Sequence, residues 1–260
     1  MRAVLFAVPA VIACLAAGIA SAPAEGGWWA PPQHLTWYWQ LQGTIRIGEP
    51  VAAYDVDGFE TSAAQVGLLH SEGRRVICYV DVGTAENFRP DYSQFPKSAM
   101  GRSNGWPGEH WLDIRRLDVL EPIMAARLQM CREKGFDAVE PDNVEAFSNR
   151  SGFPVTASDQ LTYNEWVATE THSLGMAVLQ KNDGEQTAQL HSYFDGALTE
   201  QCNQYGECPL FQEYLDAGQP VLNAEYRLAR GRFCSSDNTA GIMGARMNLA
   251  LNGHRFESCW

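Results

Sequence analysis

The sequence lacks the short motifs that mark a metal centre or a nucleotide-binding loop. It has no Cys-x-x-Cys pair, and its 6 histidines show neither His-x-His nor His-Glu-x-x-His spacing. No Gly-x-Gly-x-x-Gly turn follows the first predicted strand, where an open dinucleotide-binding sheet would carry one. These absences argue against a metalloenzyme and against a doubly wound sheet, and we expect no cofactor.

Basic residues are scarce as well. The chain has 19 Lys and Arg against 31 Asp and Glu, which gives a formal net charge of −12 at pH 7. Such a surface disfavours binding of nucleic acid and anionic lipid and attracts a polycation. An acidic surface can also serve only to keep a protein soluble. Beyond the N-terminus, no apolar run approaches the roughly 20 residues that span a bilayer. We therefore expect no nucleic-acid partner and no transmembrane anchor.

The N-terminus has the pattern of a secretory signal peptide. One Arg precedes an apolar run, and small residues then offer cleavage after Ala22 or Ala24. A second interpretation takes residues 11–14 as a lipoprotein box anchored at Cys14, but the residues that follow stay apolar instead of turning polar. We therefore expect a signal peptide over residues 1–22 and a secreted, extracellular protein.

Apart from Cys14, the cysteines are even in number, which suits disulfides in an oxidising compartment. Several pairings are possible, and proximity in the sequence suggests Cys78–Cys131, Cys202–Cys208 and Cys234–Cys259. No linker or low-complexity tract divides the roughly 235 residues that remain after cleavage. We expect one monomeric domain over residues 23–260.

Short apolar strands alternate with amphipathic helical stretches along this domain, and most of these stretches end in Gly. The predicted strands are residues 35–41, 51–57, 75–82, 136–142, 176–182, 195–201, 220–226 and a weaker one within 241–251. The predicted helices between them include residues 61–73, 120–135, 158–175 and 209–218. Continuous apolar strands connected by helices indicate parallel pairing with both faces buried. Eight such units predict an α/β fold, a single (β/α)8 TIM barrel.

In a barrel of this kind, the chemistry lies at the carboxyl ends of the strands. Those ends carry acidic side chains at most positions here, interleaved with Trp and Tyr. Carboxylates can break a glycosidic bond and aromatic faces can stack on sugar rings, so the rim has the composition of a glycan cleft.

Several motifs together resemble the endo-α-1,4-polygalactosaminidases, glycoside hydrolase family 114, over nearly all of the mature chain. They are WYWQLQG, AAYDVDGFETS, VICYVDVGTAENFRPDYSQFP, GWPGEHWLDIR, GFDAVEPDNVE, LQKND, TEQCNQYGEC and LNAEY. The resemblance implies a (β/α)8 barrel that cleaves α-1,4-linked galactosamine polymers, which are cationic exopolysaccharides. The alternatives to this function are a glycan-binding barrel without catalysis and a hydrolase of another polysaccharide.

The catalytic pair carried over from the family motifs is Asp142 in PDN and Glu200 in TEQC. Both also lie at the carboxyl ends of predicted strands, so the residues alone make them candidates to face each other across the barrel mouth. Glycoside cleavage needs one carboxyl group as proton donor and one as nucleophile or base. We expect Asp142 to be the nucleophile and Glu200 the acid/base, the reverse assignment being the alternative.

Other residues at the predicted strand ends are expected to bind substrate. Asp55 and Asp57 could hold substrate ammonium groups or loops, Lys181 and Asn182 could orient Asp142, and Asp81 and Glu86 are expected to form a salt-bridge network with Arg89. Trp28 and Trp29 could extend the cleft or pack the barrel bottom. The full set of predicted substrate-binding residues is Trp37, Asp55, Asp57, Tyr79, Asn143, Lys181, Asn182, Glu225 and Tyr226.

Overall fold

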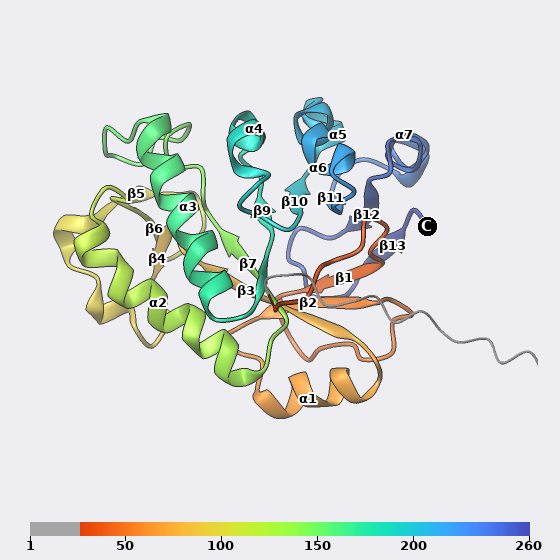
Figure 1. Cartoon of the computed structure of the whole chain (residues 1–260), viewed down its shortest axis with the longest axis horizontal. Coiled ribbons are helices and arrows are strands. Elements are labelled where there is room, and N and C mark those ends of the chain that lie inside the picture. The colour runs from red at the N-terminus through yellow and green to blue at the C-terminus, as the bar shows by residue number, and fades with distance from the viewer. Residues whose placement is uncertain (1–26) are drawn as a thin grey trace, which may run out of the picture.

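Parallel strands that follow one another in chain order form the wall of a barrel in the computed structural model, which describes residues 27–260 (Figure 1). One sheet has the order β1-β2-β3-β7-β8, and the second has β9-β10-β11-β12 with antiparallel β13 at its edge. Only Leu179 separates β8 from β9, so the fifth predicted strand joins the two sheets. The wall consists of β1 (Trp37–Gln40), β2 (Ala53–Asp57), β3 (Arg75–Asp81), β7 (Ala138–Asp142), β8 (Ala177–Val178), β9 (Gln180–Lys181), β10 (Ala197–Glu200), β11 (Val221–Glu225), β12 (Met243–Met247) and β13 (Phe256–Ser258).

The barrel closes between its last and first strands without a regular ladder among the described residues. The Trp37 indole Nε1 donates to the Met243 carbonyl at 2.8 Å, and the Leu41 amide donates to the Leu251 carbonyl at 2.8 Å. These bonds connect β1 to β12 and to the loop that follows it. The expectation of a TIM barrel is confirmed, with an irregular seam at this one position.

Helices cover the outside of the barrel, largely where the sequence predicts them. They are α1 (Ala63–Ser71), α2 (Leu117–Lys134), α3 (Ala157–Ser173), α4 (Thr187–Leu190), α5 (Cys202–Tyr205), α6 (Gln212–Asp216) and α7 (Cys234–Ala240). Ser62 starts α1 with a capping box, and Gly135 ends α2 in the left-handed region at φ 91°. The predicted helix over 209–218 is shorter, since its first part is a 3-10 turn. None of these helices, within residues 27–260, has the length and apolarity to cross a membrane.

A small antiparallel sheet, which the sequence analysis did not predict, is inserted between β3 and α2. It contains β4 (Thr84–Glu86), β5 (Met100–Ser103) and β6 (Glu109–Leu112), in the order β4-β6-β5. In Figure 1 it lies beside α2 at one side of the barrel. Its turn between β5 and β6 carries Trp106. The unit that begins with β1 also differs from a regular β/α unit, because the described chain between β1 and β2 contains no helix.

Alternate residues of each strand pack on opposite sides of the wall. On β3, Ile77 belongs to the apolar cluster inside the barrel, whereas Val76 and Val80 belong to the cluster under α1, α2 and α3. This period of two is the direct result of strand geometry. The same alternation turns Glu140 and Asp142 of β7 inwards, where both face Lys181, with Val139 packed outside.

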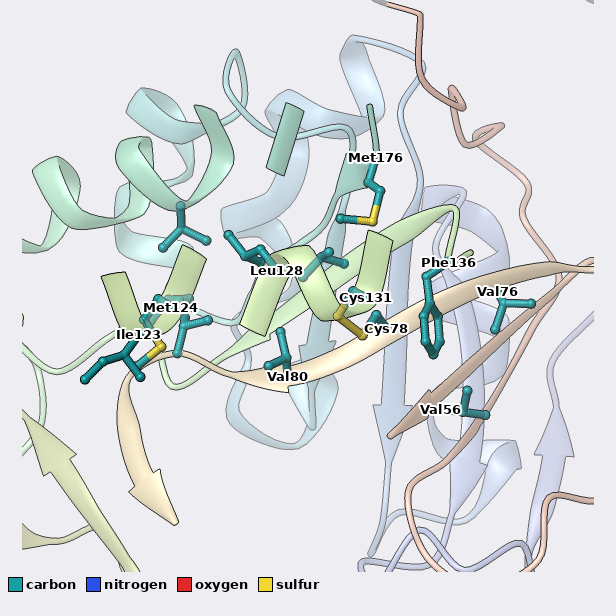
Figure 2. Close-up of a cluster of buried hydrophobic side chains, with 14 of the residues drawn as sticks. Val56, Val76, Cys78, Val80, Ile123, Met124, Leu128, Cys131, Phe136 and Met176 are labelled. Carbon is teal, nitrogen blue, oxygen red and sulfur yellow. A yellow bond between two sulfur atoms is a disulfide. The ribbon is translucent and has the colours of Figure 1, made fainter. Parts of the chain in front are cut away.

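Three disulfides reinforce this arrangement, with the pairing expected from the sequence. Cys78–Cys131 joins β3 to α2 within the outer cluster, and Figure 2 shows it between Val80 and Phe136. The other two, Cys202–Cys208 and Cys234–Cys259, lie near the ends of α5 and α7. The predicted signal peptide and Cys14 fall in residues 1–26, outside the described residues.

Candidate active site

The two predicted catalytic carboxylates lie at the same mouth of the barrel. Asp142 is the last residue of β7 and Glu200 is the last residue of β10. Lys181, the last residue of β9, lies between them: its Nζ is 2.8 Å from Asp142 Oδ1 and 3.3 Å from Glu200 Oε2. The barrel therefore brings together two acids that are far apart in the sequence and places one cation between them.

Lys181 is nearly inaccessible, with 3% of its side chain exposed. Its third acidic neighbour is Glu140, whose Oε1 lies 3.1 Å from Nζ, and its ammonium group is 4.9 Å from the centre of the Trp39 ring. Burial lowers the pKa of Lys181, but the charges of its carboxylate neighbours more than offset this and raise the pKa well above its usual value. The group is therefore permanently cationic.

Asp142 accepts a second hydrogen bond from the Tyr79 hydroxyl at 2.8 Å. Burial alone would raise the pKa of Asp142, but the Lys181 charge and the hydrogen bonds from Lys181 and Tyr79 hold it below its usual value. Burial raises the pKa of Tyr79, so this hydroxyl keeps its proton and stays a donor. Asp142 is thus ionised at neutral pH, as a nucleophile has to be.

Glu200 has a different set of partners. The Tyr226 hydroxyl donates to Glu200 Oε1, and the Asn182 side-chain amide donates to Oε2 at 3.2 Å. The Asn182 side-chain oxygen also accepts from the Glu200 backbone amide at 2.8 Å. Asn182 therefore holds both the backbone and the side chain of Glu200, rather than Asp142 as the sequence suggested.

Below this layer, deeper in the barrel, Asp55 of β2 and Glu140 of β7 are neighbours, and both are completely buried. Burial and then the charge of Glu140 raise the pKa of Asp55 well above its usual value, and burial raises the pKa of Glu140 to about 7. Two carboxylates this close cannot both ionise. Asp55 therefore keeps a proton, and Glu140 faces Lys181.

The residues that directly follow Asp142, Lys181 and Glu200 have an unusual backbone conformation. Asn143, Asn182 and Gln201 have φ of 62°, 45° and 57°, and they directly follow Asp142, Lys181 and Glu200. Such left-handed conformations are uncommon for residues other than Gly and persist where the surrounding structure enforces them. Here Asn143 is tied by its side chain to Asp81 and Asp142, and Asn182 is tied to Glu200.

Two adjoining pockets open at this mouth. The Asp142 pocket, of about 300 Å³, is lined by Trp39, Asp57, Glu60, Tyr79, Glu86, Phe88, Arg89, Glu109, Asp142 and Lys181 together with loop residues 41–42 and 250–251. The Glu145 pocket, of about 580 Å³, is lined by Glu145, Phe147, Ser148, Asn149, Asn182, Asp183, Gly184, Glu185, Thr199, Gln201, Tyr205, Glu207, Leu210, Phe211 and Tyr226. Both pockets share Trp106, Glu200 and Leu249. The mouth is therefore a cleft that continues on both sides of Glu200.

Three predicted substrate-binding residues cannot touch a ligand in this structure. Trp37, Asp55 and Glu225 are completely buried and line neither pocket. Trp37 closes the barrel seam, Asp55 pairs with Glu140, and Glu225 accepts the backbone amide of Asn203 at 2.9 Å. For these three residues the expectation of direct binding is wrong, because their positions on the strands lie below the rim or turn them towards a neighbouring helix.

Asp57 lines the Asp142 pocket but is already paired. Arg89 binds both of its oxygens, at 3.0 and 2.6 Å, and also bonds Glu86 at 3.0 Å. The expected Arg89 network is therefore confirmed for Glu86 and extended to Asp57. Asp81 does not take part in it: its Oδ1 accepts the backbone amides of Gly83 and Thr84, at 3.0 and 2.7 Å.

Trp28 and Trp29 lie at the opposite end of the barrel from the pockets. Trp28 stacks on His172 with ring centres 4.0 Å apart and donates to Asp195 at 3.0 Å, just before β10 begins. Trp29 lies under the Arg75 guanidinium at the start of β3, 5.7 Å from it. Both tryptophans therefore pack the barrel bottom, which is one of their two expected roles.

The sequence analysis gave no role to several residues of the cleft. Trp106 was part of a quoted motif, and its position between Gly105 and Pro107 in a polar segment is a signal of an exposed aromatic side chain. Glu145 ends the quoted motif GFDAVEPDNVE, which contains four acids, but nothing in the sequence shows which of them reach the cleft. Within residues 27–260 no group of three or more His, Cys, Asp or Glu side chains is arranged to hold a metal ion.

Comparisons with known proteins identify the family and the fold of the chain. The model of Glycoside-hydrolase family GH114 matches residues 18–259. The crystal structure of Aspergillus fumigatus Ega3 in complex with galactosamine is similar at a TM-score of 0.84 and 30% identity, over 89% of this chain and 97% of that one. The glycoside hydrolase domain of PelA from Pseudomonas aeruginosa shares the fold at a TM-score of 0.65 and 12% identity, over 86% and 97%. Among curated protein sequences, none matches this chain. The expected resemblance is confirmed: the chain belongs to Glycoside-hydrolase family GH114 and is a glycoside hydrolase with a TIM-barrel fold.

Proposed function

We propose that the protein is a secreted endo-acting glycosidase that cleaves α-1,4-linked galactosamine polymers with Asp142 and Glu200. The observation that carries this proposal is the position of both carboxylates beside Lys181 at the centre of an open cleft. The similarity to Ega3, whose structure holds galactosamine, supports the choice of sugar. The net charge of −12 suits a cationic polymer.

The distances favour a mechanism that retains the configuration at the anomeric carbon. Asp142 Oδ1 and Glu200 Oε2 lie 2.8 and 3.3 Å from the same Lys181 nitrogen. These two oxygens can therefore be no farther apart than the two distances combined, which is less than the about 6.5 Å at which inverting enzymes begin. A shorter separation leaves no room for a water between sugar and carboxylate, so one carboxylate attacks the sugar itself.

In the first step Asp142 attacks the anomeric carbon while Glu200 gives its proton to the oxygen that leaves. This breaks the glycosidic bond and forms an ester between Asp142 and the sugar. In the second step Glu200, now ionised, takes a proton from water, and the resulting hydroxide displaces Asp142. Lys181 and Tyr79 keep Asp142 ionised and oriented, and Tyr226 and Asn182 orient Glu200.

The continuity of the cleft supports an endo mode of cleavage. Glu200 lines both pockets, so a chain can extend from the reacting bond in both directions. The predicted signal peptide supports secretion, and the three disulfides suit an oxidising compartment. Mass analysis of the exported protein should then find Pro23 or Glu25 as its first residue.

The test is digestion of partially deacetylated α-1,4-galactosaminogalactan, with products sized by mass spectrometry. We expect oligomers from the wild type, and at least a roughly 1,000-fold lower rate from Asp142→Asn and from Glu200→Gln, since each change removes only an ionisable group. Glu133→Gln, the same change on the exposed face of α2, is the matched control and should behave as wild type.

Two results would contradict the proposal. Near-normal cleavage by both active-site variants would remove Asp142 and Glu200 from the chemistry. Polymer that the wild type binds without cutting would instead indicate a glycan-binding barrel.

A further inference from the structure

We propose that Glu140 is a positioning residue of the reaction, which holds the ammonium group of Lys181 between the two catalytic carboxylates from beneath the cleft. This proposal rests on the proposed function and deepens it, because it gives a role to a buried acid that the mechanism does not use. It follows from the three ion pairs of Lys181, from the closed surroundings of Glu140 and from the movement of charge during the reaction.

Lys181 lies where three carboxylates meet. Its Nζ is 2.8 Å from Asp142 Oδ1, 3.1 Å from Glu140 Oε1 and 3.3 Å from Glu200 Oε2. An ammonium group is a point charge on a flexible stem, so its position is set by the partners of its three donors. Asp142 and Glu200 line the cleft, whereas Glu140 is completely buried and lines neither pocket. Two partners therefore attract the ammonium group towards the mouth, and Glu140 attracts it towards the barrel interior.

Glu140 has a fixed position relative to the nucleophile. It precedes Asp142 by two residues on β7, so both side chains leave the strand on the same face. Both positions are paired with β3, where Tyr79 and Asp81 are their partners. Groups on paired strands hold their geometry more precisely than groups on loops. The sheet therefore fixes the spacing of Glu140 and Asp142, and with it the place of an ammonium group that contacts both.

The interior around Glu140 offers its charge no other partner. Neither of its oxygens has a hydrogen bond of good geometry, and the same holds for both oxygens of its buried neighbour Asp55. Within residues 27–260, the ion pair with Lys181 is the only one that Glu140 makes. A buried carboxylate with so few donors is costly, and the paired cation offsets this cost. Because Asp55 keeps its proton, the single negative charge of the two acids faces Lys181.

The reaction moves negative charge from one side of Lys181 to the other. Asp142 is ionised at the start, and after the first step Asp142 is an ester and Glu200 is ionised. Lys181 can neutralise each acid in turn only if it stays within reach of both. Without Glu140, the charge of Asp142 would draw the ammonium group to one side. This would stabilise the free enzyme more than the transition state, which lowers kcat.

The first test is a double-mutant cycle on the cleavage of deacetylated α-1,4-galactosaminogalactan at about pH 8. Glu140→Gln keeps the shape of the side chain and removes its charge. We expect it to lower kcat roughly tenfold with little change in KM, because Glu140 does not touch the substrate. In a Lys181→Met background the same change should not lower kcat further, since its effect passes through the ammonium group. Glu133→Gln should leave kcat unchanged in both backgrounds.

A purely structural role of Glu140 predicts a different result. The two losses would then multiply, and Glu140→Gln/Lys181→Met would be roughly ten times slower than Lys181→Met alone. That outcome would overturn the proposal, and so would a wild-type kcat in Glu140→Gln. Glu140→Met also lacks the charge but fills the site with apolar atoms, and it should show the same loss. Near-UV circular dichroism checks that each variant is folded.

The pH dependence of kcat shows whether the charge of Glu140 is what matters. Burial raises the pKa of Glu140 to about 7, so its carboxylate gains a proton as the pH falls through this value. Lys181 stays cationic there, and the other ionisable groups near Glu140 are Asp55 of β2, Tyr79 of β3, Asp142 of β7 and Tyr226 after β11. Asp55 and the two tyrosines keep their protons, and Asp142 stays ionised.

Of these groups, Glu140 is therefore the one that changes its charge near pH 7. The kcat of the wild type should exceed that of Glu140→Gln roughly tenfold at about pH 8 but only roughly twofold at about pH 6. A ratio that stays constant across this range would contradict a role of the charge, because a difference in packing does not titrate.

Unfolding experiments separate this proposal from the proposed function. Urea titration at about pH 8 gives the free energy of unfolding of the wild type, Glu140→Gln, Lys181→Met and the double variant. Each partner of a buried pair depends on the other, so the double variant should lose less stability than the two single variants combined. If the wild type cleaves no polymer, the proposed function fails, yet this coupling still supports the held ammonium group. Losses that simply add would reject it even if the polymer is cleaved.

Discussion

At the scale of single residues, the site depends on Lys181. One ammonium group lies within 3.3 Å of three carboxylates, and it is the only Lys or Arg among the contacts of Asp142 that the structure describes. We expect it to act through these acids, which makes it a positioning residue. Its removal would leave a buried negative cluster without a counter-charge.

We expect Lys181→Met to lower kcat/KM roughly 100-fold or more and to move the acidic limb of the pH profile to higher pH. The sign follows from Asp142: Lys181 lowers the pKa of Asp142, so without Lys181 the carboxylate protonates at higher pH. Lys97→Met, at an exposed position, is the control. An acidic limb that stays in place, with the fold intact by near-UV circular dichroism, would contradict this role.

The sequence identified the catalytic candidates at this scale but not the depth of each residue. Asp55, Asp57, Glu140 and Asp142 look equivalent in a sequence, because each follows the period of two along an apolar strand. In the barrel, Asp142 reaches the cleft, whereas Asp55 and Glu140 lie below it with no exposed surface. The depth of a side chain in the barrel depends on the stagger of neighbouring strands, such as the pairing of Asp81 with Asp142. This stagger cannot be read from the pattern of a single strand.

At the scale of elements, the strands were predictable and the inserted sheet was not. Residues 76–80 of β3 form a continuous apolar run, which is typical of a buried parallel strand. The strands β4, β5 and β6 are three or four residues long, and Gly101, Gly105 and Gly108 interrupt their segment. The alternation of apolar and polar residues that marks a strand cannot be recognised in segments this short, so the sequence analysis missed the β5–β6 hairpin that carries Trp106.

The disulfides should contribute unequally to stability. Cys78 and Cys131 are 53 residues apart, whereas Cys202 and Cys208 are 6 apart. Closing the longer loop removes more entropy from the unfolded chain, about 4 kcal/mol against about 2 kcal/mol. We therefore expect Cys78→Ala/Cys131→Ala to lower the free energy of unfolding about twice as much as Cys202→Ala/Cys208→Ala, measured by urea titration. Equal losses would contradict this account.

At the scale of the whole molecule, buried acids determine how stability depends on pH. Burial raises the pKa of Glu140 and Glu145 to about 7 from 4.5, and of Asp183 to about 9 from 3.8. Between each pair of values the folded protein binds more protons than the unfolded chain, so stability falls as the pH rises. Asp142 acts in the opposite sense, but its lowered pKa matters only below its usual 3.8.

We therefore expect the melting temperature to decline as the pH rises from about 5 to about 9. Asp183→Asn should remove part of the decline, since the amide cannot ionise, whereas Glu133→Gln should not. Differential scanning calorimetry across this range is the measurement. A melting temperature that increases steadily from pH 5 to pH 9 would show that these groups do not control stability.

The stacking of Trp28 on His172 has a practical consequence for how the enzyme can be attached to a surface. This contact fixes the start of the described chain at the barrel bottom, away from the cleft. A bead or fusion partner linked through the N-terminus would leave the mouth directed outwards, free to receive a long polymer. Immobilised in this orientation, the enzyme should keep its access to large substrates that a linkage near Trp106 or Leu249 would block.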